Sequence, residues 1–456
     1  MIKRNVVAGF ALVASLAATS AARADTLASA LTSAYNNSGL LEQNRALLRA
    51  ADEDVAQSVA ALRPVISWAL SAERDFIGTA TTDVVATNSA TLSVSASLTV
   101  YDNGVNQLAV DAQKEIVLST RQTLESIEQS VLLDGVEAYM SVVRDREFVE
   151  LRESNVRVLT EEFRAAQDRF EVGEVTRTDV ALAEAQLAAA RSLLAAAQGA
   201  LVQSIELFRV AIGRAPGAVG AVSPAPVSQS VSEAKAFAVR NNPSVLEGQH
   251  AVAAAEINIR RAELSLRPTL TLDGFVARDN DANDSAQIGL NLGSTIYAGG
   301  QISSQIRQLR ANRDASRAGL HLTQLSVEQS VGNAFASLQV ARASLDASEQ
   351  EVRAARVAFE GVREEATLGS RTTLDVLSAE QELLDAEVNR ISAQADEVIA
   401  SYTVLSAMGL LTADHLNLQV QQYDPTAYYN LAKEAPSYDS EQGEALDRIL
   451  EALGKE

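Results

Sequence analysis

The sequence predicts a mainly α-helical protein with a smaller β-sheet, built from two copies of one unit. Three observations lead to this fold class. A set of residues recurs 196 positions later in the chain, apolar residues recur every seven positions over long stretches, and four short segments alternate apolar and polar side chains. Together they indicate internally duplicated long coiled-coil helices, with two strands in each copy.

The first 24 residues read as a secretory signal peptide. Lys3 and Arg4 precede an apolar run over 6–18, and Ala22-Arg23-Ala24 has the pattern of a cleavage site. The mature chain is therefore expected to begin near Asp25. No later stretch is expected to cross a membrane as a helix, because about 20 consecutive apolar residues are needed.

The two copies match at a constant spacing. Tyr101 corresponds to Tyr297 and Gly104 to Gly300. The longest match pairs Gly173, Thr176, Asp179, Val180, Ala183, Glu184 and Leu187 with Gly369, Thr372, Asp375, Val376, Ala379, Glu380 and Leu383. The predicted organisation is a first structural repeat at 25–212, a Gly-, Pro- and Ser-rich linker at 213–230, a second structural repeat at 231–411 and a C-terminal tail at 412–456.

Each repeat is expected to begin with helices that stop at an Arg-Pro pair. A short helix ends at an Asn-Asn turn, and a longer one follows over 40–62 or 244–266. The two Arg-Pro pairs, at 63–64 and 267–268, are 204 residues apart. The first copy therefore has eight additional residues before Tyr101, and we expect them to form a surface loop.

Strands are expected over 65–73, 92–100, 269–276 and 287–297. Residues 92–100 alternate strictly between apolar residues and Ser or Thr. The polar connections at 76–89 and 278–285 are typical of loops. The second connection resembles the start of a calcium-binding loop, but Asp284 and Leu290 replace the required Gly and Glu, so no metal site is predicted.

A long helix is expected over about 105–169, followed by a glycine turn and a return helix of about 35 residues. At ~1.5 Å per residue the long helix would measure ~97 Å, and the shorter helices before the strands and after the turn would together measure ~87 Å. The two shorter helices can therefore stack end to end beside the long one. A seven-residue apolar period predicts left-handed coiled coils. It runs through Val142, Val149, Val156, Phe163 and Phe170, then Val180, Leu187, Leu194, Leu201 and Phe208, then Leu338, Leu345, Val352 and Phe359, and finally Leu377, Leu384, Ile391, Val398 and Leu405.

Composition excludes several classes of function. The formal net charge is −21, and −24 without the three cationic residues of the signal peptide, so the chain repels phosphate groups and nucleic-acid binding is not expected. Cysteine is absent, which excludes disulfides, thiolate catalysis and a lipid-anchored N-terminal cysteine. The three histidines lack metal-ligand spacing, and no hydrolase or phosphate-loop motif occurs. We therefore predict neither a cofactor nor an enzyme.

The strands raise a problem of closure. Strands of about ten residues can cross a bilayer when tilted, but an open four-stranded sheet would leave unpaired edges in lipid. Three identical chains would supply twelve strands, a permitted number for a closed barrel. The alternative prediction is a soluble periplasmic coiled-coil scaffold or adaptor protein with a small β-cap.

The order of these features resembles the TolC family of outer-membrane efflux proteins. The duplicated order of helix, Arg-Pro, hairpin, Y(D/A)(N/G)G, long helix and Gly-turn followed by Thr-x-x-Asp-Val covers nearly all of 25–412. The resemblance implies a homotrimer with a 12-stranded outer-membrane β-barrel and a periplasmic α-barrel. It also implies a passive exit duct of a tripartite efflux pump or type I secretion system. Its implied partners are a periplasmic adaptor (membrane fusion) protein and an inner-membrane transporter, either ABC or proton-driven.

The same resemblance assigns a gate at the glycine turns. Asp375 corresponds to the acidic ring that narrows the pore, and Ser378 stands where a second ring Asp is usual. Arg371 corresponds to the locking cation and is expected to bond Thr178 and Asp179. Three copies of one carboxylate around an axis form a negative collar that favours cations, and their repulsion raises the pKa of each. The alternative role for Asp375 and Asp179 is capping of a helix N-terminus.

Other positions complete the expectations. Gly173 and Gly369 mark the turns that the resemblance directs toward the adaptor. Ala366 replaces a locking Tyr and Arg363 replaces an acid, so the resemblance implies a differently connected lock. At the sheet, the aromatic residues Trp68, Tyr101, Phe275 and Tyr297 are candidates for anchoring at the membrane interface, with ordinary packing as the alternative.

Overall fold

The computed structural model describes residues 25–79, 82–227 and 230–453. The predicted signal peptide at 1–24 lies outside the described residues. The described chain contains α1 (Leu27–Asn37), α2 (Gly39–Ala60), β1 (Val65–Thr79), β2 (Thr82–Tyr101), α3 (Val105–Glu171), α4 (Arg177–Ile212), α5 (Val231–Asn241), α6 (Pro243–Leu264), β3 (Thr269–Asp279), β4 (Asp284–Gly293), α7 (Gln301–Thr367), α8 (Thr373–Met408), α9 (Pro425–Ala432) and α10 (Glu441–Leu453).

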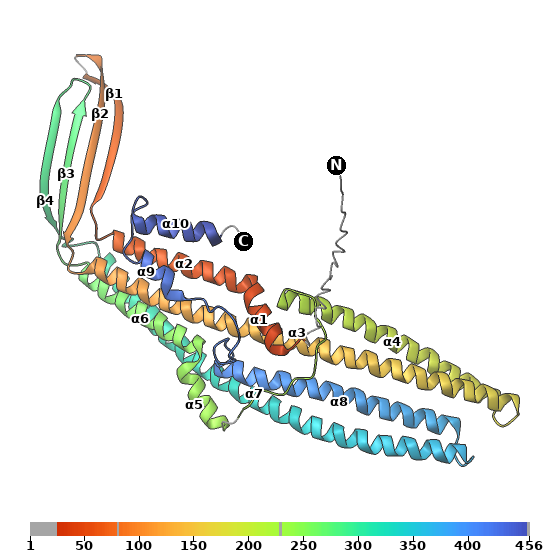
Figure 1. The fold of residues 1–456 in the computed structure, drawn as a ribbon. Coiled ribbons are helices and arrows are strands. Elements are labelled where there is room, and N and C mark those ends of the chain that lie inside the picture. The colour runs from red at the N-terminus through yellow and green to blue at the C-terminus, as the bar shows by residue number, and fades with distance from the viewer. Residues whose placement is uncertain (1–24, 80–81, 228–229, 454–456) are drawn as a thin grey trace, which may run out of the picture.

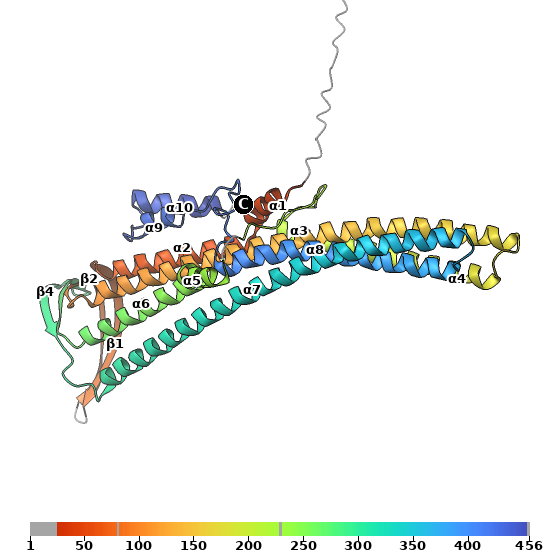
Figure 2. The ribbon, with the colours of Figure 1, turned by 90° about the horizontal axis from the view of Figure 1, so that it is seen from below.

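The molecule is elongated, with the β-sheet at one end of a helical shaft (Figure 1). α3 and α7 each contain 67 residues and run along the shaft to a turn at the opposite end. α2 and α4 both pack against α3, and α6 and α8 both pack against α7 (Figures 1 and 2). This arrangement confirms the prediction that two shorter helices stack beside each long one. α3 also packs against α6 and α8, which joins the two copies into one shaft.

Matching residues begin the long helices in both copies. Gly104 precedes α3 with φ +85°, and Gly300 precedes α7 with φ +84°. These backbone conformations lie in the left-handed region, which glycine adopts without the steric cost that a Cβ atom imposes. The chain can therefore turn sharply from β2 into α3, and from the segment after β4 into α7.

The largest hydrophobic core lies near the middle of the shaft, where α1, α3, α4, α8 and the tail meet. Tyr139 of α3 and Phe208 of α4 are almost completely buried there, with ring centroids 6.3 Å apart. A second, smaller core around Val331 of α7 and Val404 of α8 serves the other copy. Both cores contain heptad residues, such as Val142 and Leu338, together with residues of the short helices α1 and α5.

The sheet is antiparallel in the order β1-β2-β3-β4. β1 and β2 contain 15 and 20 residues, whereas β3 and β4 contain 11 and 10. The predicted surface loop at 76–89 is therefore wrong. Its additional residues lengthen the first hairpin, and the pairs Asp75–Thr87 and Phe76–Ala86 extend the ladder. The segment is rich in Thr and Val, which favour extended backbone, and cross-strand pairing overrides its polarity.

β4 lies earlier in the chain than the predicted strand at 287–297. It pairs with β3 from Arg278–Asp284 to Thr269–Gly293. β3 begins directly after Pro268, so β4 has no hydrogen-bonding partner beyond Gly293. Tyr297 consequently lies in the connection to α7 rather than on a strand, which corrects its predicted position.

The C-terminal tail lies along α2 (Figures 1 and 2). The hydroxyl of Tyr428 donates a hydrogen bond to Glu53 at 2.7 Å, and the Arg63 guanidinium donates to the backbone oxygens of Glu434 and Ala435. α10 then packs on α9 through Leu446. The tail therefore wraps the shaft beside the strand end of α2.

By length and composition alone, α4 could cross a membrane. No other helix in the described part of the chain meets both conditions. The sequence did not lead us to expect such a segment. α4 meets these conditions because its many alanines raise its mean hydropathy without bulky side chains. In the structure α4 packs against α3, and its small residues permit close helix contact.

Candidate pore gate and membrane-facing sheet

The two faces of the sheet differ in polarity. Trp68 of β1 pairs with Val94 of β2, and Val94 pairs with Val276 of β3, so these side chains share a face. The adjacent pair along these strands, Ser67 and Ser95, lies on the opposite face because successive side chains of a strand alternate between faces. The apolar face carries Ile66, Trp68, Leu70, Leu92, Val94, Ala96, Leu98, Leu272, Val276, Ile288, Leu290 and Leu292.

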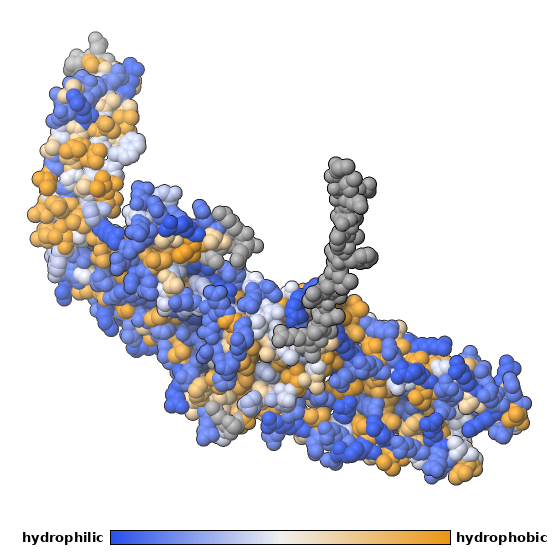
Figure 3. Space-filling view, viewed as in Figure 1, coloured by the Kyte–Doolittle hydropathy of each residue, from blue (hydrophilic) through white to orange (hydrophobic). Residues whose placement is uncertain are grey.

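This apolar face is exposed in the single chain. Trp68 is 74% exposed, Leu292 is 71% and Ile288 is 78%. Figure 3 shows hydrophobic residues over much of the sheet and more hydrophilic residues toward its far end. An exposed apolar band on strands long enough to cross a bilayer is typical of a lipid-facing barrel wall, with the polar face toward the lumen.

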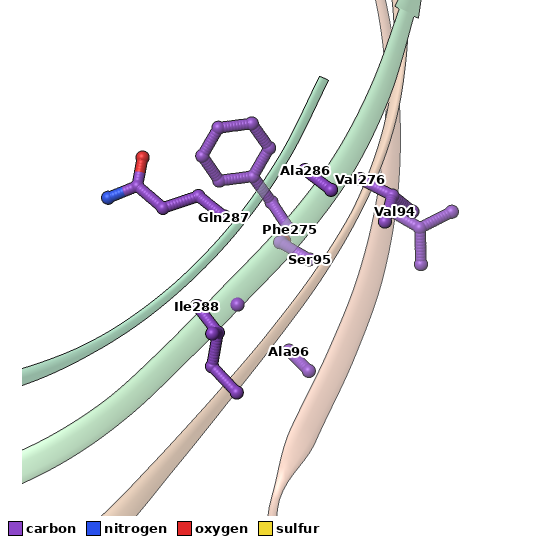
Figure 4. A pocket seen from close by; sticks show the side chains of 9 residues that line it. Val94, Ser95, Ala96, Phe275, Val276, Ala286, Gln287 and Ile288 are labelled. Carbon is purple, nitrogen blue, oxygen red and sulfur yellow. The ribbon is translucent and has the colours of Figure 1, made fainter. Parts of the chain in front are cut away.

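Three of the four aromatic candidates lie on strands, in different environments. Trp68 lies on the apolar face, and Tyr101 at the end of β2 pairs with Leu270 across a register shift. Phe275 instead pairs with Ser95 and Gln287, so it lies on the polar face. Figure 4 shows Phe275 and Gln287 on one side of the strands, with Val94 and Val276 on the other. This register corrects the predicted lipid-anchoring position of Phe275. Trp68 and Tyr101 stay predictions as interface anchors.

β1 and β4 are the edges of the sheet within the described chain. Their outer N–H and C=O groups have no strand beside them in one protomer. Lipid offers no hydrogen bonds to such groups, so strands of neighbouring identical chains must complete the ladder. One sheet therefore supplies four strands to a larger closed barrel.

The predicted gate lies at the opposite end of the shaft. Gly173 with φ +81° and Gly369 with φ +78° form the turns after α3 and α7. Their neighbours Val172 and Leu368 are 72% and 81% exposed. Each hairpin therefore presents one apolar side chain at its turn.

Both return helices begin with the same capping box. Thr372 Oγ1 accepts from Asp375 N at 3.2 Å, and the Asp375 carboxylate accepts from Thr372 N at 2.9 Å. Thr176 and Asp179 repeat this geometry at 3.3 and 2.8 Å. The capping alternative is thus confirmed for both aspartates. In Asp375 the backbone N–H and then the hydroxyl of Thr372 lower the pKa, so its carboxylate is charged at neutral pH.

Several predicted lock residues line one cavity between the two hairpins. Its volume is about 640 Å³, and Asp179, Arg363, Ala366 and Arg371 all contribute to its wall. The predicted bonds of Arg371 to Thr178 and Asp179 are not formed within the protomer. The Arg371 guanidinium instead donates to Glu365 at 2.8 Å, because that carboxylate lies on the same turn.

The remaining gate positions are placed as follows. Arg363 stands where the family resemblance leads us to expect an acid. Its guanidinium lies 3.8 Å from the Glu162 carboxylate, so it has an acidic partner on α3. Ser378 is exposed one turn after Asp375, and Thr178 is exposed in the first turn of α4. The pore role of Asp375 and Ser378 and the lock role of Arg371, Thr178 and Asp179 remain predictions.

Sequence reasoning missed Glu380. Its side chain is 6% exposed, and its Oε1 accepts a hydrogen bond of 2.9 Å from Asn155 of α3. A signal was available in the heptad pattern, because Glu380 stands three residues after Leu377 and so at a core-facing position. Burial raises the pKa of Glu380 to about 7, and nearby Glu162 acts in the same direction.

Comparison with known proteins agrees with this geometry. The family described as "Outer membrane efflux protein" matches residues 30–214 and 237–410, one segment for each repeat. The chain is also 36% identical over 440 residues to the outer membrane efflux protein BepC of Brucella suis biovar 1, covering 95% of this chain and 96% of that protein. This chain belongs to the outer membrane efflux protein family.

Other similar proteins are more distant. The outer membrane protein TolC of Vibrio cholerae is 27% identical over 62% of this chain and 69% of its own length. The crystal structure of the Campylobacter jejuni CmeC outer membrane channel superposes with a TM-score of 0.75 at 16% identity, covering 90% of each chain. That likeness establishes the shared fold.

Family membership decides between the two functions that the sequence left open. As an outer membrane efflux protein, the chain is an exit duct located in the outer membrane and extending into the periplasm. The apolar sheet face lies toward lipid in this setting, which a soluble scaffold would leave without a partner. Members of the family are channels that form trimers within tripartite pumps or secretion systems, not enzymes.

Proposed function

We propose that the periplasmic end of the duct is gated by a ring of Asp375 carboxylates, one from each of three protomers. The observation that supports this is the position of Asp375 in the first turn of α8, three residues after Thr372 and directly beside the Gly369 turn. The capping box fixes the carboxylate there and lowers its pKa. A threefold ring of charged carboxylates would concentrate cations and bind polyvalent ones.

The test is block of purified trimers by trivalent cations in planar bilayers. Asp375→Asn removes the charge while retaining an oxygen that can accept from Thr372 N, so the cap is preserved better than in an alanine variant. We expect block to weaken by about tenfold or more. Ser378→Asp adds a second acidic ring one turn away and is expected to strengthen block. Unchanged block in both variants would remove these residues from the pore.

We propose further that the turns at Gly173 and Gly369 receive a periplasmic adaptor, which connects the duct to an inner-membrane transporter. Support comes from Val172 and Leu368, which are exposed apolar residues at matching places in the two repeats. Exposed apolar residues at the end of a polar shaft are suited to contact with partner helices. The duct then receives its cargo from the pump and conducts it passively.

Co-purification of the adaptor with the duct tests this contact. Leu368→Glu places a charge at the turn and is expected to reduce recovered adaptor by about tenfold. Tyr438→Glu is the control, because Tyr438 is 80% exposed in the connection between α9 and α10, and these helices lie toward the sheet end of the shaft in Figure 1. Equal adaptor recovery with the two variants would place the docking surface elsewhere.

A further inference from the structure

A buried polar pair joins the two helical hairpins near their free ends. Asn155 of α3 is 7% exposed and Glu380 of α8 is 6% exposed. The Asn155 amide donates to Glu380 Oε1 at 2.9 Å, while Glu380 Oε2 is buried with no hydrogen-bond partner among the described residues. A buried carboxylate oxygen without a partner is costly when the group is ionised, and much less so when it is protonated.

The surroundings of this pair are apolar on the side that faces the turns. Asn155 lies one turn from Leu159, and Glu380 lies one turn from Leu377. Leu159 and Leu377 belong to one buried cluster with Leu187 of α4, which packs the two hairpins together. Closer to the turns, the cavity of about 640 Å³ separates them. Along α3 and α8 this cluster lies between the pair and the cavity, so the pair belongs to the packed part of the contact between the hairpins.

Charged groups near Glu380 come from two elements. Glu162 on α3 opposes ionisation of Glu380, and Arg363 on α7 favours it, although the Arg363 guanidinium is also 3.8 Å from Glu162. The hydrogen bond from Asn155 favours ionisation as well. Desolvation is the largest effect, and it raises the pKa of Glu380 to about 7 from an ordinary value of 4.5.

We infer that Glu380 and Asn155 form a protonation-dependent latch that holds α8 against α3, so that ionisation of Glu380 loosens the second hairpin from the first. The sign follows from linkage. An acid whose pKa is higher in the packed state than when exposed favours packing most at low pH, and this advantage falls as the pH rises from about 4.5 to about 7. Glu380 acts here as a positioning residue, because it sets where α8 and its gate residues lie.

The internal duplication supplies a matched control. Glu184 is the counterpart of Glu380, 196 residues earlier, in the same place on α4, but its side chain is exposed. Glu380→Gln keeps an oxygen that can accept from Asn155 and removes the titration. Glu184→Gln removes one carboxylate per protomer without touching the latch. The two variants therefore have the same charge and differ only in which helix has lost its acid.

The first measurement is the conductance of purified trimers between about pH 5.5 and 8.5, and it rests on the proposed gate at the turns. We expect wild type and Glu184→Gln to show a several-fold rise in mean conductance with a midpoint near pH 7. Glu380→Gln should stay at the low-pH level throughout. Asn155→Leu removes a bond that favours ionisation, so its midpoint should move to higher pH.

The second measurement does not depend on conduction. The chain contains no cysteine, so Val172→Cys and Leu368→Cys can carry spin labels at the two turns without further changes. In trimers containing a minority of labelled chains, we expect the distance between labels to lengthen from low to high pH in the Glu184→Gln background and to stay constant with Glu380→Gln. Identical pH responses in these two backgrounds would overturn the latch. A wild type that never conducts while the distances behave as expected would overturn the gate and leave the latch standing.

Discussion

The return helices of the two repeats, α4 and α8, have the same length and the same ends but differ in how much of their surface the protomer buries. Each contains 36 residues, begins at a Thr-x-x-Asp capping box and ends at a glycine with positive φ. α8 buries Leu377, Leu384 and Ile391 along its heptad face. α4 leaves Val202 59% exposed and Val210 86% exposed.

The duplicated sequence therefore specifies local structure, while neighbouring elements decide what each copy buries. Within the protomer α8 packs against α3 and α7, whereas α4 has α3 as its principal partner. The exposed apolar row on α4 is thus available for contact with another protomer of the trimer. The same contrast separates the exposed Glu184 from the buried Glu380.

The largest effect that can test this comparison is expected at the matched aromatic pair Tyr139 and Phe335. Tyr139 is 1% exposed, and its hydroxyl donates to Asp25 O at 2.5 Å and accepts from Gly220 N at 3.1 Å. Phe335 is half-buried. Tyr139→Ala should therefore lower the free energy of unfolding by ~3–5 kcal/mol, and Phe335→Ala by less than half as much.

Urea unfolding of the purified trimer, followed by circular dichroism, measures both changes. Tyr139→Phe places the residue of the second copy into the first and removes only the hydroxyl contacts, so it should cost about 1–2 kcal/mol. An equal cost for the two alanine variants would show that the copies contribute equally to the core. Burial within one protomer would then not predict how much each copy contributes to the free energy of unfolding.

The parts of the fold that depend on nearby residues could be predicted from the sequence. Helix lengths, glycine turns and the stacking of shorter helices beside α3 and α7 follow from heptads and from residues such as Gly173 and Thr176. The strand limits could not be predicted in the same way. The first hairpin extends through the expected loop because residues 82–91 find partners across the hairpin, and those partners are set by register.

The candidate site also contains features that depend on nearby residues and features that depend on partners elsewhere in the chain. The capping role of Asp179 and Asp375 depends on a four-residue motif, Thr-x-x-Asp, and was predicted as an alternative. The burial of Glu380 was not, because Glu184 occupies the same place in an equivalent motif and remains exposed. The heptad position of Glu380 indicated a core-facing side chain, and the packing of α8 against α3 buries it. The register of Phe275 likewise depends on its partners Ser95 and Gln287.

The smallest expected effect concerns the two capping threonines, which the comparison predicts to be alike. Thr176 has φ −90° and Thr372 has φ −91°, both are exposed, and each bonds to the third residue of its helix. Because these contacts are local, Thr176→Ala and Thr372→Ala should each destabilise the first helical turn by ~1 kcal/mol, despite the different burial further along α4 and α8. Hydrogen exchange of the amides of Asp179 and Asp375 measures this fraying directly. Thr→Ser at either position retains the hydroxyl and should leave exchange nearly unchanged. If the free-energy cost of Thr372→Ala were several times that of Thr176→Ala, tertiary packing would contribute to the cap at Thr372. Local and neighbour-dependent structure could then not be separated at the turn where the gate is proposed.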